Sequence, residues 1–198
     1  FLGITVPQSR SIAKQFLTLS FGDIKILLQS KYHEERLIAL LILVENYKNK
    51  KTTVQQKEKI YNFYLQNTSF VDNWDLVDSS ADKIVGEFLF GKDKKILHYL
   101  VTSKNIWERR IAIVATFAFI RKDQFAETFL ITEKLLHDRH DLLHKAGGWM
   151  LREAGKRNQE QLEKFLKQHY KNMPRTMLRY AIERFEEEKR KKYLMGTI

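Results

Sequence analysis

Apolar side chains recur with helical spacing along the whole chain, and long alternating strand patterns are absent. The 198 residues include only 2 prolines and 8 glycines, too few for the frequent turns of a many-stranded β protein. The pattern therefore predicts an all-α protein. The expected helices span residues 7–19, 22–29, 32–48, 53–66, 74–90, 93–102, 105–120, 124–136, 141–154, 158–170 and 174–190.

Residues that favour helix ends support these boundaries. Pro7 and Pro174 suit a first helical turn, and Gly91 and Gly155 suit the end of a helix. The side chains expected to cap helix N-termini are Asp23, Asn73, Ser103 or Asn105, and Asn158. After Phe185 a run of charged residues predicts a helix that ends in solvent.

A weak repeat runs through the helices. Two segments match closely, 35–39 (ERLIA) and 108–112 (ERRIA), and alanines recur within apolar helices at intervals of 31 to 42 residues. A period of about 35–40 residues made of two helices is typical of an α-solenoid. The alternative is an irregular helical bundle with a chance spacing of alanines. We favour the solenoid because the two Glu-Arg segments lie about two periods apart. The repeating alanines are Ala39, Ala81, Ala112, Ala146 and Ala181.

The composition limits the classes of partner. Lysine and arginine number 35 against 24 acidic residues, a formal net charge of +11. This balance favours a polyanion, with nucleic acid first, an anionic membrane surface second, and a basic protein without a special partner as the remaining alternative. There is no cysteine, which excludes disulfides and thiolate metal sites and fits a reducing cytosol. The apolar runs 37–44 and 111–120 are too short to cross a bilayer.

Trp74 and Asp78 stand four residues apart in a predicted helix. Positions i and i+4 share one face, so the indole and the carboxylate point the same way. In so basic a chain, this pair suggests a site that holds a nucleobase and does chemistry beside it. Asp75 is expected only to complement the helix macrodipole.

The other tryptophans also lie near charged residues at helical spacing. Trp107 precedes Arg110, and we interpret Trp107 as a core residue. Trp149 follows Gly147 and Gly148 in the middle of a predicted helix, where each glycine costs about 1 kcal/mol relative to alanine. Such a conflict indicates a close approach to the backbone, either by a neighbouring helix or by a ligand.

Four blocks stand in order along the chain: FLGITVP (1–7), NWDLVD (73–78), NIWERR (105–110) and KAGGWMLRE (145–153). Together they resemble the DNA alkylation repair glycosylases built from HEAT-like repeats, the AlkD type. The resemblance implies a right-handed α-solenoid of two-helix repeats that removes cationic purines, alkylated at N3 or N7, from duplex DNA. It implies that Asp78 is catalytic and that Trp74 and Trp149 line the cleft beside the lesion. Arg110, or Arg109 if the register differs by one, would contact the DNA near the lesion.

The resemblance also bears on the extent of the chain. We expect a single HEAT-like repeat domain over residues 1–198. The chain begins at Phe1 without an initiator methionine, and the family's segment before the FLGITVP block is absent. We therefore expect that the natural N-terminal segment is missing.

The chemistry of such a lesion suits a site with one carboxylate. Sugar O-glycosidases use two carboxyl groups, one of which protonates the leaving group. An N3- or N7-alkylated purine already carries positive charge and leaves without an acid. One carboxylate can then stabilise the oxocarbenium-like sugar and position a water. Aromatic faces add cation–π attraction to the charged base, ~0.5–2 kcal/mol each.

Two further groups of polar residues have weaker interpretations. His137, His140 and His144 could mimic a metal site, but a helix break near 138–139 favours solvated or phosphate-contacting histidines. A set of basic side chains near the turns between helices could contact phosphates, although solvated side chains are the simpler reading of each. These are Lys48, Lys50, Lys51, Arg121, Lys122, Lys156 and Arg157.

These observations predict a DNA glycosylase that acts on double-stranded DNA containing alkylated bases. We expect a monomer in the cytoplasm, associated with the nucleoid, with no metal, no cofactor and no membrane partner. A non-catalytic HEAT-repeat protein that binds damaged or branched DNA is the second hypothesis, and a protein–protein scaffold is the third. The Trp74–Asp78 pair argues against the second, because a phosphate binder gains nothing from a carboxylate. The charge argues against the third.

Overall fold

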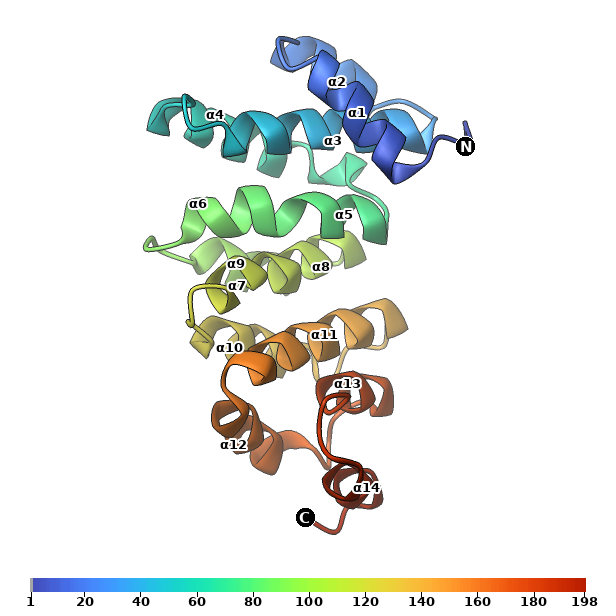
Figure 1. Ribbon diagram of the computed structural model, residues 1–198, viewed down its shortest axis with the longest axis vertical. Helices are drawn as coiled ribbons and strands as arrows, with labels where there is room; N and C mark the ends of the chain where they lie inside the picture. The colour runs from blue at the N-terminus through green and yellow to red at the C-terminus, as the bar shows by residue number, and fades with distance from the viewer. Residues whose placement is uncertain (1) are drawn as a thin grey trace. The chain divides into compact units, whose positions relative to one another are not determined.

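The computed structural model describes residues 2–198, and every regular element within them is helical. The chain divides into two compact units, Phe1–Lys92 and Asp93–Ile198. Figure 1 colours the first unit from blue to green and the second from green to red. We describe each unit separately.

The first unit is built around helix α3 (His33–Lys48). Eight consecutive residues of α3, 37–44, are buried, because neighbouring elements cover the helix on several sides. Helices α1, α2, α4 and α5 and the segment η2 all pack against it. The other elements of the unit are α1 (Val6–Gln15), α2 (Phe21–Leu28), α4 (Val54–Gln66), the 3₁₀ turn η1 (Thr68–Phe70), α5 (Trp74–Ala81), the π-helical segment η2 (Asp82–Gly86) and α6 (Glu87–Leu89).

The second unit has α11 (Asp141–Arg157) at its centre. Helices α8, α9, α10, α12 and α13 pack against it. Their apolar faces supply a core that includes Phe119, Met150 and Leu166, all fully buried. The other elements are α7 (Lys95–Leu100), α8 (Ile106–Ala115), α9 (Phe117–Ile120), α10 (Ala126–Leu135), α12 (Gln159–His169), α13 (Arg175–Ala181) and α14 (Glu187–Met195).

Most of the predicted helix starts are confirmed. The side chains of Asn73, Asn105 and Asn158 each accept a hydrogen bond from a backbone N–H in the first turn of the helix that follows. The prediction that Asp23 is an N-cap residue is wrong by about one turn. Ser20 is the N-cap of α2, and Asp23 is its partner three residues on, joined by a 2.6 Å hydrogen bond from the Ser20 hydroxyl.

Two predicted helix ends are wrong. Gly155 does not stop a helix, because α11 continues to Arg157; the glycine instead lets Leu162 of α12 approach closely. The helix predicted over 174–190 is two helices, α13 and α14, separated by a break at 182–186. The last helix is not wholly solvated either. Tyr193 is 1% exposed and packs against the rings of Tyr170 and Phe185.

The two Glu-Arg segments occupy equivalent places at the starts of α3 and α8. In each, the guanidinium reaches back to a carbonyl six residues earlier in the chain. Arg36 Nη1 donates to the carbonyl of Ser30 at 2.8 Å, and Arg109 Nη1 donates to the carbonyl of Ser103, also at 2.8 Å. Both arginines therefore close the loop that precedes their helix, which agrees with the predicted repeat.

Each of these arginines also pairs with an aspartate that lies just before a later helix of the same unit. Arg36 Nε lies 3.3 Å from Asp72 Oδ1, just before α5. Arg109 Nε donates to Asp138 Oδ2 at 2.7 Å, just before α11. We call this arrangement of carbonyl, guanidinium and carboxylate the arginine clasp. Each clasp therefore joins the start of one helix to the start of a later one in the same unit.

Buried tyrosines give the fold a predictable response to alkali. Burial, helped in Tyr47 by the charge of Glu87, raises the pKa of Tyr47 to about 12. The pKa of Tyr193 is also raised to about 12, mainly by burial and further by the charge of Glu163. An unfolded tyrosine titrates near pH 10, so the folded state keeps its phenol protons when the unfolded state has lost them. We expect the contribution of these tyrosines to the free energy of unfolding to be constant below pH 10 and to fall between about pH 10 and 12.

Urea denaturation followed by circular dichroism at pH 8, 10 and 11 measures this fall. Tyr47→Phe is the matched control, since it keeps the ring and removes the titrating hydroxyl. Its unfolding free energy should fall less steeply with pH than that of the unsubstituted chain. Identical slopes for the two proteins would contradict the prediction for Tyr47.

Candidate active site

Helix α5 presents Trp74 and Asp78 in its first and second turns. Asn73 Oδ1 accepts the backbone N–H of Trp74 at 2.7 Å and fixes the start of the helix. Because 74–81 is regular α-helix, the two side chains lie one turn apart on the same face. The indole of Trp74 is 53% exposed and Asp78 is partly exposed. An aromatic platform and a carboxylate therefore stand side by side at the surface of the first unit.

Two aspartates near Asp78 also make contacts within the fold. Asp75 Oδ2 lies 2.6 Å from His33 Nε2 on α3, and its Oδ1 accepts the backbone N–H of Leu76 at 2.9 Å. The expectation that Asp75 only complements the macrodipole is thus wrong. Asp82 is 2% exposed and accepts a 2.7 Å hydrogen bond from Lys83 Nζ. Asp78 is the carboxylate that shares a helical face with the exposed indole.

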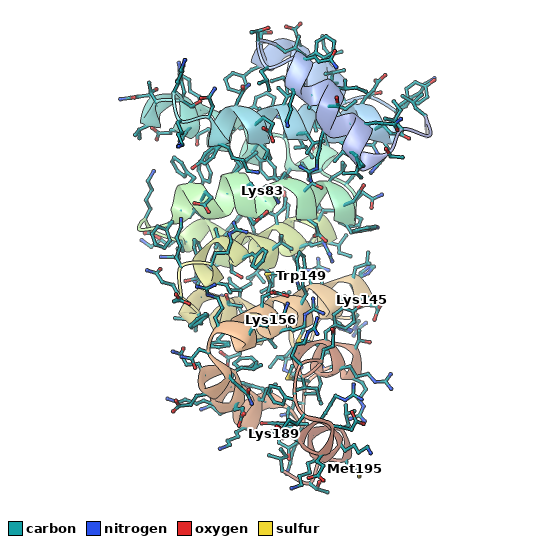
Figure 2. The ribbon with its side chains drawn as sticks, viewed as in Figure 1. Lys83, Lys145, Trp149, Lys156, Lys189 and Met195 are labelled. Carbon is teal, nitrogen blue, oxygen red and sulfur yellow. The ribbon has the colours of Figure 1, made fainter. Side chains whose placement is uncertain are left out.

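A π-helical segment begins four residues after Asp78. Wider π turns inside α-helices occur often at functional sites, because they redirect the side chains that follow. Here the π segment η2 carries Lys83, which Figure 2 labels. Lys83 Nζ lies 3.3 Å from the backbone carbonyl of Asp78. A positive charge therefore stands close to the second turn of α5.

A chain of buried hydrogen bonds holds α5 on its inner face. The hydroxyl of Ser80 donates to the carbonyl of Leu76 at 2.6 Å, and the Tyr64 hydroxyl, 3.0 Å away, can therefore donate to Ser80 Oγ. Burial raises the pKa of Tyr64 above its ordinary value; the charges of Asp82 and Asp78 add to the effect, against the hydrogen bond to Ser80. Tyr64 on α4 thus holds the buried face of the helix whose other face carries Asp78.

The second unit holds the other predicted lesion-contact residues. The glycines before Trp149 meet α13: a Cβ on Gly148 would lie 2.5 Å from the Met177 carbonyl oxygen and 2.5 Å from Tyr180 Cβ. Of the two explanations for the glycine pair, a close neighbouring helix is the one observed. Trp149 is partly exposed, with its ring 5.7 Å from that of Phe117. Lys145, Trp149 and Lys156 follow one another along α11 (Figure 2).

Arg109 and Arg110 point to different neighbours. Arg109 belongs to the arginine clasp, and its side chain is 16% exposed. Arg110 is 5% exposed, and its Nη1 donates to the carbonyl of Leu142 in the first turn of α11 at 2.5 Å. Trp107 is partly exposed rather than buried. The predicted contacts of either arginine with DNA stay predictions.

The basic residues predicted to contact phosphates differ in their surroundings. Lys48, Lys50 and Lys51 are exposed at the end of α3. Lys156 Nζ pairs with Glu153 at 2.8 Å, and Arg157 forms a two-pronged pair with Asp123 at 2.7 and 3.0 Å. Both Arg121 and Lys122 are exposed, and the Arg121 guanidinium lies 4.7 Å from the ring centre of Phe117.

The histidine group of the second unit stabilises the start of α11. His144 Nε2 donates to the carbonyl of Asp138 at 2.6 Å, and His137 and His140 are exposed. Within residues 2–198, no group of three or more His, Asp or Glu side chains has an arrangement that could hold a metal ion.

Comparison with known proteins agrees with the resemblance found in the sequence. The sequence profile of the family described as DNA alkylation repair enzyme matches residues 1–185. The chain belongs to this family. Membership gives the chain a role in DNA repair and DNA as its partner. No curated protein sequence matches it significantly.

Two solved structures share the fold. A predicted DNA alkylation repair enzyme from Enterococcus faecalis is 19% identical, with a TM-score of 0.75 over 94% of this chain and 89% of that one. AlkD2 from Streptococcus mutans is 18% identical, with a TM-score of 0.64 over 94% of this chain and 93% of that one. The predicted all-α solenoid class is therefore confirmed. Among residues 2–198, no helix combines the length and apolar character that crossing a bilayer requires.

Three residues close to α5 were not predicted from the sequence. His33 and Arg36 lie on α3, about forty positions before the aspartates that they contact, Asp75 and Asp72. Lys83 lies in the π segment. The repeated Glu-Arg segment was a signal for Arg36, because a guanidinium at an equivalent place in two repeats indicates a shared structural role. Nothing in the sequence singled out His33.

Proposed function

We propose that this member of the DNA alkylation repair enzyme family is a DNA glycosylase. It hydrolyses the N-glycosidic bond of purines alkylated at N3 or N7 in duplex DNA, with Asp78 as the catalytic carboxylate and Trp74 beside the lesion. The observation that carries the proposal is the arrangement of α5, in which a partly exposed carboxylate follows a 53% exposed indole by one helical turn.

The reaction needs few protein groups. The bond between C1′ and the purine nitrogen breaks, and its electron pair neutralises the cationic base, which leaves without being protonated. Positive charge then develops on the sugar. An ionised Asp78 stabilises that charge and accepts a proton from the water that attacks C1′, so that the products are a free base and an abasic site. The exposed face of Trp74 attracts the cationic base, worth ~0.5–2 kcal/mol.

Surface charge supports duplex DNA as the substrate. The net charge of +11 favours a polyanion, and exposed lysines such as Lys48, Lys50 and Lys51 are suited to phosphates. A protein that acts on chromosomal DNA would reside with the nucleoid in the cytoplasm and could work as a monomer. Arg110 or Arg109, Trp149, Arg121, Lys122, Lys156 and Arg157 are proposed as further DNA contacts in the second unit.

Release of alkylated bases tests the function directly. The protein is incubated with methylated duplex DNA, and free 7-methylguanine and 3-methyladenine are quantified by chromatography. We expect both bases to be released, at a rate that falls as salt rises, because phosphate contacts weaken with ionic strength. No release, together with salt-sensitive binding to the same DNA, would overturn the glycosylase proposal and select a non-catalytic DNA-binding protein.

A further inference from the structure

The first turn of α5 is fastened to α3 at two points. The first is the arginine clasp, in which Asp72 pairs with Arg36. The second is the contact between His33 Nε2 and Asp75 Oδ2, 2.6 Å apart. A carboxylate can only accept, so His33 Nε2 carries the proton. His33 is 8% exposed and the Asp75 side chain 23% exposed, so water competes little for this hydrogen bond.

The second unit offers an internal comparison. Arg36 and Arg109 of the two clasps are 73 residues apart, and the residue 73 positions after His33 is Ile106, which cannot make this contact. The aspartates three residues after Asp72 and Asp138 also make different contacts. Asp75 reaches to α3, whereas Asp141 pairs with Lys145 on its own helix at 2.7 Å. The clasp is thus common to both units, whereas at the two clasps compared the histidine–aspartate contact is made at α5 and not at α11. Elsewhere in the second unit, His98 Nε2 lies 2.7 Å from Glu127 Oε1.

We propose that His33 is a positioning residue that acts through Asp75 to fix the first turn of α5. This inference rests on the proposed function of α5. Asp75 stands between Trp74 and Asp78 in sequence, and its other oxygen accepts the backbone N–H of Leu76. The tether therefore runs from the imidazole through the carboxylate to the backbone that carries the indole.

A tether of this kind matters because the first turn of α5 is a helix end. Helix ends fray, and a misplacement of about 1 Å can cost roughly a hundredfold in rate. Removing the tether should therefore lower the rate of the chemical step. The phosphate contacts, which lie elsewhere, should be unchanged.

His33→Leu and His33→Gln in the full chain test the proposal. Leucine removes the donor, whereas the glutamine amide can still donate to Asp75. Under single-turnover conditions with excess enzyme, we expect base release from methylated duplex DNA to fall at least about tenfold in His33→Leu and to recover to within about threefold in His33→Gln. The dissociation constant for the DNA should change less than about twofold in both.

A spectroscopic readout separates this inference from the proposed function. In a background of Trp107→Phe and Trp149→Phe, Trp74 is the remaining tryptophan, and acrylamide quenching of its fluorescence reports how accessible its indole is from solvent. Quenching should increase in His33→Leu and not in His33→Gln. If the unsubstituted chain releases no base, the proposed function fails, while the quenching still decides whether His33 holds this turn.

Asn46→Ala is the control for a general loss of stability. It removes a 3.0 Å hydrogen bond from the last turns of α3 to the carbonyl of Leu17, between α1 and α2. It should lower the unfolding free energy without changing Trp74 quenching or the rate of base release. Unchanged quenching in His33→Leu, or an equal loss of rate in His33→Leu and Asn46→Ala, would overturn the positioning role.

Discussion

Asp78→Asn should slow the release of 7-methylguanine from methylated duplex DNA by about 10²–10³-fold. The substitution keeps the shape of the side chain and removes the negative charge that opposes the charge developing on the sugar. The neutral amide also cannot accept a proton from the attacking water. The proposed leaving base is already cationic and needs no protonation, so no general acid in the site could make up for the lost carboxylate. Binding of undamaged duplex DNA should change little, since phosphates are bound by the basic side chains.

Single-turnover release with excess enzyme, together with the DNA dissociation constant, measures this effect. Asp23→Asn is the matched control, because it neutralises an aspartate of the same unit that accepts a hydrogen bond from Ser20, the N-cap of α2. It should release bases at the unsubstituted rate. Release undiminished in Asp78→Asn would refute the assignment of Asp78 and leave the glycosylase activity standing.

Gly148→Ala should lower the free energy of unfolding by about 1–3 kcal/mol. A Cβ at this position would meet the carbonyl oxygen of Met177 and Cβ of Tyr180 at 2.5 Å each. Neither atom is the end of a flexible side chain, so α13 must move away from α11. The better helix propensity of alanine, about 1 kcal/mol, offsets part of this cost.

The neighbouring glycine supplies the control. At Gly147, an added Cβ would lie 3.0 Å from the terminal methyl of Met177, which can rotate aside. Gly147→Ala should therefore be close to neutral. Urea denaturation measures the free energy of unfolding of both variants. Equal values for the two proteins would contradict a tight α11–α13 contact at Gly148. Base release by Gly148→Ala then reports whether Trp149 depends on that contact.

The parts of the site that were predictable from sequence are local. The start of α5 depends on Asn73 and the next few residues, and the shared face of Trp74 and Asp78 depends only on helical spacing. A sequence pattern carries such information directly. The glycine pair before Trp149 was also recognised as a close approach, but the partner could be named only once α13 was seen to pack there.

The contacts that escaped prediction join residues far apart in the chain. His33 and Asp75 are 42 positions apart, and no spacing rule links them. Gly155 looked like a helix stop because glycine often ends helices; here the missing side chain makes room for Leu162 instead. The composition of 82–86 does not distinguish a π segment from an ordinary α-helical turn; in the structure these residues pack against α3 and α4.

The paired cations at the end of α11 change what salt should do to DNA binding. Lys156 and Arg157 already have Glu153 and Asp123 as counterions that belong to the protein. If a phosphate takes such a cation, it must displace a carboxylate, which can then take up a cation in place of one released from the DNA. The vacated carboxylate then faces the duplex and repels it. A count of basic residues therefore overstates the binding energy available from phosphates, and exposed lysines such as Lys48, Lys50 and Lys51 contribute more per charge than the paired residues of α11.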